Sequence, residues 1–243
     1  MKKLVILPIF LFCGILFSQD LNGSWKLTHK NGESVTDKEV VRISQDGYFA
    51  FGSKEAGTNK FLSAGGGEFT VTGNKYIETR DFDTQDTARI GKSKEAVLSW
   101  EGDNTIVISD GSVSKKWEKI PAAADALTRN WVITGRERNG EMDTMTPGDR
   151  RTVKILSGGR FQWIAFNSAT GEFSGTGGGT YTAVDGKYIE NIEFFSRDDS
   201  RVGASLEFDF EVKDGKWHHK GTSSKGDPIY EIWSPYTEAY KKP

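Results

Sequence analysis

The chain has 243 residues, of which 36% are hydrophobic and 27% are charged, and its formal net charge is −2. This balance is typical of a water-soluble globular protein and excludes a chain that is disordered or membrane-embedded throughout. The lysines and arginines are scattered, so no basic field is available to hold a phosphate backbone, and we expect no nucleic-acid partner. The 28 glycines and 12% aromatic residues, against only 6 prolines, favour many strands joined by tight turns.

The first 18 residues have the layout of a secretory signal peptide. Lys2 and Lys3 give a positive start, the run 4–17 is almost wholly apolar, and the small residue Ser18 precedes a polar pair. The run is too short to span a bilayer comfortably, so we expect cleavage after Ser18 and no stable membrane span afterwards. An uncleaved N-terminal anchor is the alternative. The predicted destination is the periplasm or the outside of the cell.

The only cysteine, Cys13, lies inside this apolar run. The mature protein is therefore expected to have no disulfide and no thiol chemistry. A lipoprotein would be acylated at Cys13, but the bulky Phe12 stands where bacterial lipoprotein signals carry a small residue.

The rest of the chain contains an internal duplication with a constant shift of 112 residues (153 − 41). A repeat of this kind must be recognised before strands are assigned, because it decides the fold. The matching blocks are 41–43 with 153–155, 47–51 with 159–163, 65–70 with 177–182, 75–78 with 187–190, and 89–91 with 201–203. Chance similarity between Gly-rich segments is the alternative, and the constant register argues against it.

Near the ends of the copies the shift changes, as loop insertions between fixed strands produce. Residues 21–25 match 127–131 at a shift of 106, and Trp117 matches Trp233 at 116. The Ala-rich segment 121–126 lies between the copies and is interpreted as a linker. We therefore predict one domain over residues 21–120 and a second over residues 127–236.

Alternation with a period of two predicts strands rather than helices in each copy. In the segment 206–212 every apolar side chain falls on one face and every acidic one on the other, and Asp214-Gly215 follows as a hairpin turn. Segments 180–184 and 187–195 are predicted strands around Asp185-Gly186. Seven or eight short strands per copy predict an all-β fold of two tandem antiparallel barrels, because closing a sheet removes its exposed edges.

Two sets of residues carry a family resemblance. The segment Gly23-Ser24-Trp25 resembles the Gly-x-Trp opening signature of lipocalins and related calycins, although copy two has Arg129-Asn130-Trp131 there. The blocks at 161–163, 177–181 and 187–190 resemble the small lipocalin-like domains of secreted Bacteroidetes proteins. The resemblance covers nearly all of the mature chain, and it implies lipocalin-like barrels exported from a Gram-negative bacterium. It does not indicate a ligand, since a fold does not fix a function.

A recurring pair of charges is the first candidate for a ligand site. Glu190 and Arg201 are separated by the same eleven positions as Glu78 and Arg89. If the face that carries Glu190 and Tyr188 is the barrel interior, the buried carboxylate needs a partner, and Arg201 is the natural candidate. The alternatives are a purely structural ion pair or two solvated side chains.

Copy two is the favoured binding copy because its aromatic set is fuller. We predict that its barrel holds a small hydrophobic or amphipathic ligand. The predicted ligand-binding residues are Trp163, Tyr181, Tyr188, Glu190, Arg201, Phe208 and Phe210. Trp163 lies in a strand with large apolar groups on both faces, so its direction is open. Trp25 and Trp131 are expected to be core residues at a closed barrel end.

No catalytic motif, cofactor or metal site is expected. There is no Gly-x-Ser-x-Gly elbow or phosphate loop, and the glycine runs 65–67 and 177–179 are interpreted as bulges or bends. His218 and His219 are adjacent, so on a strand they face opposite sides, and His29 has no partner in sequence. The predicted function is therefore binding of a small molecule without catalysis. The alternative is an interaction or structural module with filled barrels that binds a protein or a glycan on its surface.

Overall fold

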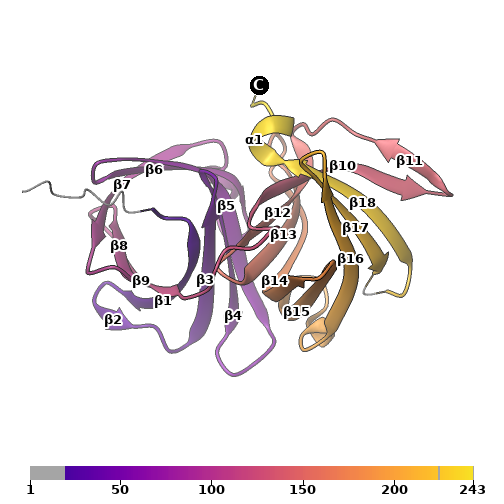
Figure 1. The fold of residues 1–243 in the computed structure, drawn as a ribbon. Helices are drawn as coiled ribbons and strands as arrows, with labels where there is room; N and C mark the ends of the chain where they lie inside the picture. Colours follow the sequence, from indigo (N-terminus) through magenta and orange to yellow (C-terminus); the bar gives the residue numbers. More distant parts are fainter. Residues whose placement is uncertain (1–19, 224, 243) are drawn as a thin grey trace, which may run out of the picture.

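The computed structural model describes residues 20–223 and 225–242, so the predicted signal peptide over residues 1–18 and Cys13 lie outside the described residues. The described chain is all-β and forms two closed eight-stranded antiparallel barrels in tandem (Figure 1). None of the helices in this part of the chain has the length and apolar character that a membrane-crossing helix needs.

The first barrel closes by pairing its first strand with its last, β1 with β9, and β2 is a short hairpin partner of β1. All its neighbouring strands are antiparallel, in the order β2-β1-β3-β4-β5-β6-β7-β8-β9. A 3-10 helix, η1 (Thr87–Arg89), lies between β6 and β7. The strands are β1 (Gly23–Lys30), β2 (Glu33–Ser34), β3 (Lys38–Gln45), β4 (Tyr48–Glu55), β5 (Phe61–Thr72), β6 (Lys75–Asp83), β7 (Ser93–Trp100), β8 (Thr105–Ser109) and β9 (Ser114–Ile120).

The second barrel repeats this topology strand for strand and closes between β10 and β18. Its 3-10 helix, η2 (Asp199–Arg201), stands at the same place as η1, and a short helix, α1 (Tyr236–Ala239), follows the last strand. The strands are β10 (Arg129–Arg138), β11 (Glu141–Thr144), β12 (Arg150–Ser157), β13 (Arg160–Asn167), β14 (Glu172–Val184), β15 (Lys187–Phe195), β16 (Ser205–Lys213), β17 (Lys216–Thr222) and β18 (Pro228–Pro235). The β10–β11 hairpin projects from the side of the barrel that faces away from the first one (Figure 1).

The turns form where the sequence predicts them, and the reason is backbone conformation. Asp185 and Gly186 both have positive φ, 51° and 76°, as a two-residue hairpin turn between β14 and β15 requires. The glycine run of β14 forms a bulge: the pairing register with β15 shifts between Gly178 and Gly179. A Cβ on Gly179 would lie 1.9 Å from the Asn191 carbonyl oxygen, so only glycine fits there.

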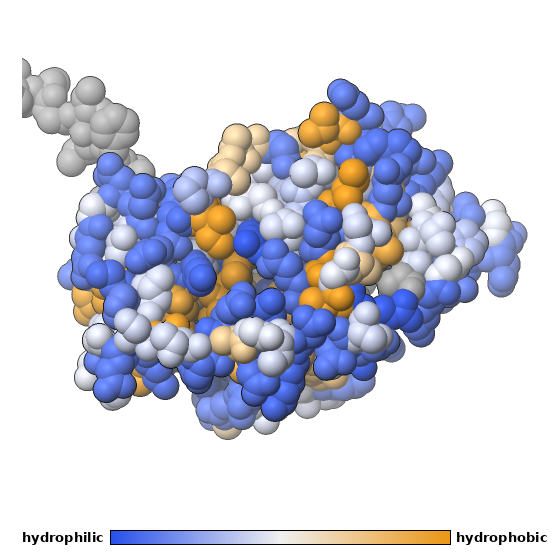
Figure 2. All heavy atoms as spheres, turned by 90° about the horizontal axis from the view of Figure 1, so that it is seen from below, coloured by the Kyte–Doolittle hydropathy of each residue, from blue (hydrophilic) through white to orange (hydrophobic). Residues whose placement is uncertain are grey.

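The two barrels pack side by side (Figure 1). Apolar side chains from the strands that meet form one buried cluster shared by both barrels. In β3 the side chain of Arg42 points into the first barrel, while that of Ile43 belongs to a buried cluster shared with the second barrel. In β12 the side chain of Lys154 likewise points into the second barrel, and that of Ile155 belongs to the shared cluster. Hydrophilic groups cover most of the face drawn in Figure 2, and the apolar groups that show there lie mainly in its middle part.

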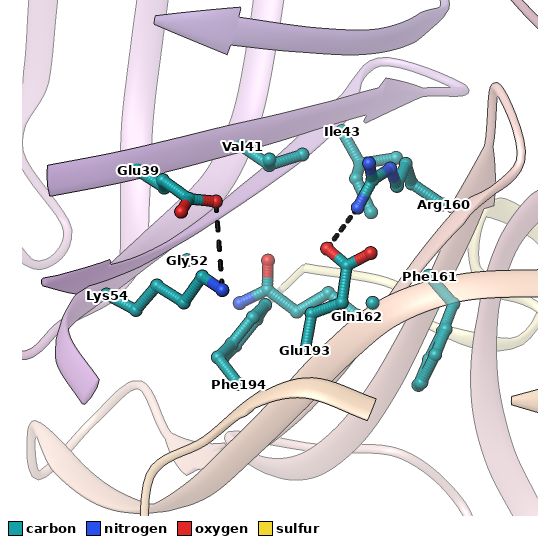
Figure 3. Close-up of a pocket in the computed structure, with 11 residues that line it drawn as sticks. Glu39, Val41, Ile43, Gly52, Lys54, Arg160, Phe161, Gln162, Glu193 and Phe194 are labelled. Carbon is teal, nitrogen blue, oxygen red and sulfur yellow. Dashed lines mark hydrogen bonds and ion pairs between the residues drawn. The ribbon is translucent and has the colours of Figure 1, made fainter. Parts of the chain in front are cut away.

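Polar contacts fix how the barrels meet. The Arg151 guanidinium of the second barrel donates a 2.6 Å hydrogen bond to the Asp81 carboxylate of the first, and both side chains are buried. The interface between the two barrels is called the joint below. A gap of about 20 Å³ remains between the barrels, with room for a water molecule at most (Figure 3). Beside it the ring of Phe194 packs on Gly52, where a Cβ would lie 2.3 Å from the ring. The joint is therefore closely fitted and leaves no ligand-sized space at this gap.

Candidate functional site

A cavity of about 820 Å³ opens into the second barrel. Its wall is a mixture of polar and apolar side chains and comes from strands that are far apart in the sequence. The apolar lining includes Ile133, Trp163, Ile192, Phe195, Leu206, Phe208 and Trp233. The alternation of side chains along each strand explains the set, because residues two apart, such as Leu206 and Phe208, lie on the same face.

Deep in the cavity lies a buried lysine in an aromatic surround. Lys154 of β12 is 4% exposed and forms an ion pair with Glu190 of β15, which is also buried. Its Nζ atom lies 5.0 Å from the ring centre of Tyr188 and 5.2 Å from that of Trp217. Aromatic faces attract a cation, and the carboxylate neutralises it, so the charge is held in a site with little water.

A second carboxylate, Glu231 of β18, lies beside this pair and is also surrounded by donors. The Arg136 Nη2 atom donates to Glu231 at 2.6 Å, and the Trp233 indole donates at 3.1 Å. Burial alone would raise the pKa of Glu231, but the hydrogen bond and charge of His219, with the charges of Arg136 and Lys154, lower it to about 2. Glu231 is therefore ionised throughout the physiological pH range.

His219 is the remaining titratable group of this cluster. Its ring lies 4.2 Å from the ring centre of Phe208, and Nδ1 is 3.4 Å from a Glu231 oxygen. Burial lowers the pKa of His219 below its ordinary value, Glu231 opposes this, and Lys154 adds to it, so the ring is neutral near pH 7. Its Nε2 atom is buried without a hydrogen-bond partner in the described chain. These residues, Lys154, Glu190, Glu231, Arg136 and His219, form the floor of the cavity. Their charges are paired, while Nε2 of His219 has no hydrogen-bond partner.

The structure places three of the seven predicted ligand-binding residues, Trp163, Glu190 and Phe208, in the cavity lining. The direction of Trp163, left open by the sequence, is into the cavity, where its ring packs edge-on against Phe195. Its neighbour Ile164 points to the joint with the first barrel. Both faces of β13 are apolar because both are covered.

The other predicted residues lie elsewhere. Tyr181 and Tyr188 are buried in the barrel core, and Phe210 packs against that core partly exposed. Burial raises the pKa of Tyr188 well above its ordinary value, and the charge of Glu190 adds to the effect. Tyr188 packs on the cavity residue Phe208, at 6.1 Å between ring centres, and Tyr181 packs on Tyr188. Trp25 and Trp131 are core residues as expected, each with its indole hydrogen-bonded to the carbonyl of the residue four positions earlier.

The predicted pair of Glu190 with Arg201 needs correction. In copy one the corresponding pair forms, with Arg89 Nη2 at 3.0 Å from Glu78. In copy two Glu190 pairs with Lys154, while Arg201 pairs with Asp198 at 3.2 Å inside the η2 turn. In copy two Lys154 of β12 is the cation in contact with Glu190, and Arg201 has a carboxylate partner within its own turn.

Sequence reasoning missed four residues of the floor: Lys154, His219, Glu231 and Arg136. A usable signal existed for the first of them, because Arg42 and Lys154 occupy the same repeat position (154 − 42 = 112) and both are cations between apolar neighbours. No repeat signal existed for His219 and Glu231, since copy one has Ile108 and Lys115 at the corresponding strand positions. The adjacent histidines lie on opposite faces of β17, as predicted. His219 is buried in the barrel, and His218 is hydrogen-bonded to the Tyr230 hydroxyl on the outer face.

The arrangement can hold a molecule with an apolar body against Trp163 and Phe208 and a polar end at the floor. Within the described residues, no group of three or more histidine, cysteine, aspartate or glutamate side chains is placed to hold a metal ion. No protein-family model matches the chain. A comparison with curated proteins likewise finds no similar sequence.

Proposed function

We propose that the protein is an exported small-molecule binding protein and that the second barrel holds an amphipathic ligand. The observation that carries this proposal is the cavity of about 820 Å³, in which apolar side chains such as Trp163 and Phe208 lie above a charged floor. Ligand sites are concave, mostly apolar and about 300–1,000 Å³ in volume, with a few placed polar groups. Protein interiors otherwise fill such space with side chains.

The floor suggests what the polar end of the ligand is. Lys154 and Arg136 are matched there by Glu190 and Glu231, so the floor itself has no excess charge to offer. A buried group of either sign would be left without compensation, which is costly. We therefore propose a neutral hydrogen-bonding group, such as a hydroxyl or an amide, at the end that reaches the floor.

The family and destination are part of the same proposal. Two closed eight-stranded barrels, the Gly23-Ser24-Trp25 segment and the apolar start of the chain fit an exported lipocalin-like domain pair from a Gram-negative bacterium. N-terminal sequencing of the protein recovered from its host tests the export step. A mature chain that begins at Gln19 is expected, and a chain that retains Met1 would contradict it.

A non-enzymatic interaction module with filled barrels is the second candidate, and one observation favours it. The interior of the first barrel carries three arginines, two carboxylates and several aromatic rings in mutual contact. In this case the outer surfaces would bind a protein or a glycan. The two candidates differ in what they predict for a hydrophobic probe.

Titration with the uncharged fluorescent probe N-phenyl-1-naphthylamine separates them. The repeat offers a matched control, because Phe51 and Trp163 occupy the same position in the two copies (163 − 51 = 112). Trp163→Ala is expected to weaken probe binding about tenfold or more, and Phe51→Ala is expected to leave it unchanged. Absence of probe binding to the wild-type protein, or equal effects of the two substitutions, would contradict a site in the second barrel.

A further inference from the structure

The first barrel encloses more positive than negative charge. Its central carboxylate, Glu78, is contacted by three guanidinium groups, at 2.8 Å from Arg80, 3.0 Å from Arg89 and 3.9 Å from Arg42. Burial raises the pKa of Glu78, but the charges of Arg80, Arg42 and Arg89 outweigh it and hold the pKa below its ordinary value. This carboxylate is thus ionised and already shared among three cations.

One further carboxylate serves this network. Asp83 lies 3.1 Å from Arg80 Nη1 and 3.8 Å from Arg89 Nη1. Three buried or half-buried arginines therefore share two acidic partners. Because a buried charge without compensation is costly, the network is one negative charge short before any other group is added.

Lys115 of β9 adds a fourth cation on the inner side of this barrel, because it lies two positions before the core residue Trp117 and so on the same face of the strand. It is half-buried, and in the described part of the chain its amine makes no hydrogen bond or ion pair. Burial, followed by the positive charge of Arg80, lowers the pKa of Lys115 to about 8, while Glu78 opposes the shift and Arg89 and Arg42 add to it. Its cross-strand neighbour on β1 is another cation, Lys30. Like charges directly opposite each other destabilise a sheet.

The second barrel shows how the same positions are balanced. There Arg136 of β10 stands opposite Glu231 of β18, and the two form an ion pair. In the first barrel the corresponding pair is Lys30 opposite Lys115. At this strand position the first barrel therefore has an amine where the second has a carboxylate.

From this juxtaposition we propose that the first barrel binds a small anion, with a carboxylate, phosphate or sulfate group, between Lys115 and the arginines around Glu78. The Arg89 side chain is 32% exposed, so an anion can reach it from solvent. The Lys115 amine and the Arg89 guanidinium supply the hydrogen-bond donors, since charge-assisted bonds to such anions are the strong ones. This site is independent of the ligand cavity in the second barrel.

Isothermal titration of the full mature chain with sodium sulfate at pH 8.5 and low ionic strength tests the proposal. Sulfate does not titrate in this range, so any proton taken up on binding passes from the buffer to a group of the protein. We expect one sulfate per chain and proton uptake, read from the heat in buffers of different ionisation enthalpy, because an anion raises the pKa of a nearby lysine. Lys115→Met is expected to weaken binding at least tenfold and to abolish the proton uptake.

The exposed Lys26 on β1 provides the matched control, and Lys26→Met should bind sulfate as the wild-type protein does. Lys115→Glu, which installs the residue type of copy two, should melt at a higher temperature than the wild-type protein in sulfate-free buffer and should not respond to sulfate. Absence of sulfate binding to the wild-type protein would overturn the proposal. So would unchanged binding by Lys115→Met, or loss of binding through Arg150→Gln at the mouth of the second barrel.

Discussion

The Ser157 hydroxyl donates a 2.8 Å hydrogen bond to the side-chain oxygen of Gln45, and these two residues occupy the same position in the two copies (157 − 45 = 112). Two equivalent positions meet only where a local two-fold axis passes between them. The barrels are therefore related by an approximate two-fold rotation, as in a symmetric dimer whose subunits have been joined in one chain.

Aromatic contacts follow the same symmetry. Phe82 stacks on Phe173 at 6.5 Å between ring centres, and Phe61 stacks on Phe194 at 6.3 Å. Phe194 is the counterpart of Phe82, and Phe173 is the counterpart of Phe61, so each contact is the image of the other. The joint thus has the reciprocal character of an isologous interface.

Substitution of Gly52 tests the fit of this joint. Gly52→Ala is expected to lower the free energy of unfolding by about 1–3 kcal/mol, because its methyl group would overlap the Phe194 ring. Urea unfolding measures the change. Gly148→Ala is the control, since a Cβ there meets nothing within 4 Å. An unchanged stability of Gly52→Ala would mean that the barrels do not pack as described.

The buried ion pair across the joint predicts a larger effect. Asp81→Asn leaves Arg151 buried without its carboxylate and should cost about 3–5 kcal/mol of unfolding free energy. The exposed pair of Lys187 and Asp209 is the comparison, and Asp209→Asn should cost much less, because solvent screens this pair. Thermal unfolding of both variants measures this difference. Equal melting temperatures would show that the Asp81 contact contributes nothing.

Substitutions of Glu190 and of Arg201 should have different effects on ligand affinity. Glu190→Gln removes the charge that balances Lys154 beside the cavity, so the affinity for N-phenyl-1-naphthylamine should change at least threefold. Arg201→Ala should leave the affinity within the error of the wild-type value, because the residue pairs with Asp198 away from the lining. A loss of binding in Arg201→Ala alone would restore the original pairing hypothesis.

Glu231 should make the free energy of unfolding depend on pH in the acid range. Its folded pKa of about 2 lies below the ordinary 4.5, so its contribution is present above pH 4.5 and is lost as the pH falls toward 2. The shift corresponds to about 3 kcal/mol at most. The gap in unfolding free energy between the wild-type protein and Glu231→Gln should therefore narrow between pH 6 and pH 3. The exposed Glu141→Gln is the control, and a gap that stays constant for Glu231→Gln would contradict the assignment.

Much of the fold is readable from the sequence because the duplication and the turns are written in the residue pattern itself, without reference to contacts between distant strands. The constant shift of 112 residues fixes which strands correspond, and Asp185-Gly186 marks a hairpin through its backbone preference. The alternation of Leu206 and Phe208 likewise gives the side of β16 that lines the cavity.

The floor of the cavity and the joint depend on contacts between distant strands. Lys154 stands between Val153 and Ile155, and apolar neighbours normally mark the inner face of a strand. Here they face the other barrel, so the charged residue is the one that points inward. The outer face of β12 is buried against the first barrel, so its apolar residues point outward and its charged residue points inward. This arrangement is visible only once the two barrels are packed together.

Native mass spectrometry of the protein purified from its own host tests the central claim, that the second barrel holds a small molecule. The wild-type chain is predicted to carry the added mass of one small molecule. Ala165→Trp places an indole in the cavity, so this variant should lack the bound molecule. Val184→Trp, at an exposed position, is the control and should retain it. A wild-type chain of bare mass, or an adduct that survives Ala165→Trp, would contradict the account.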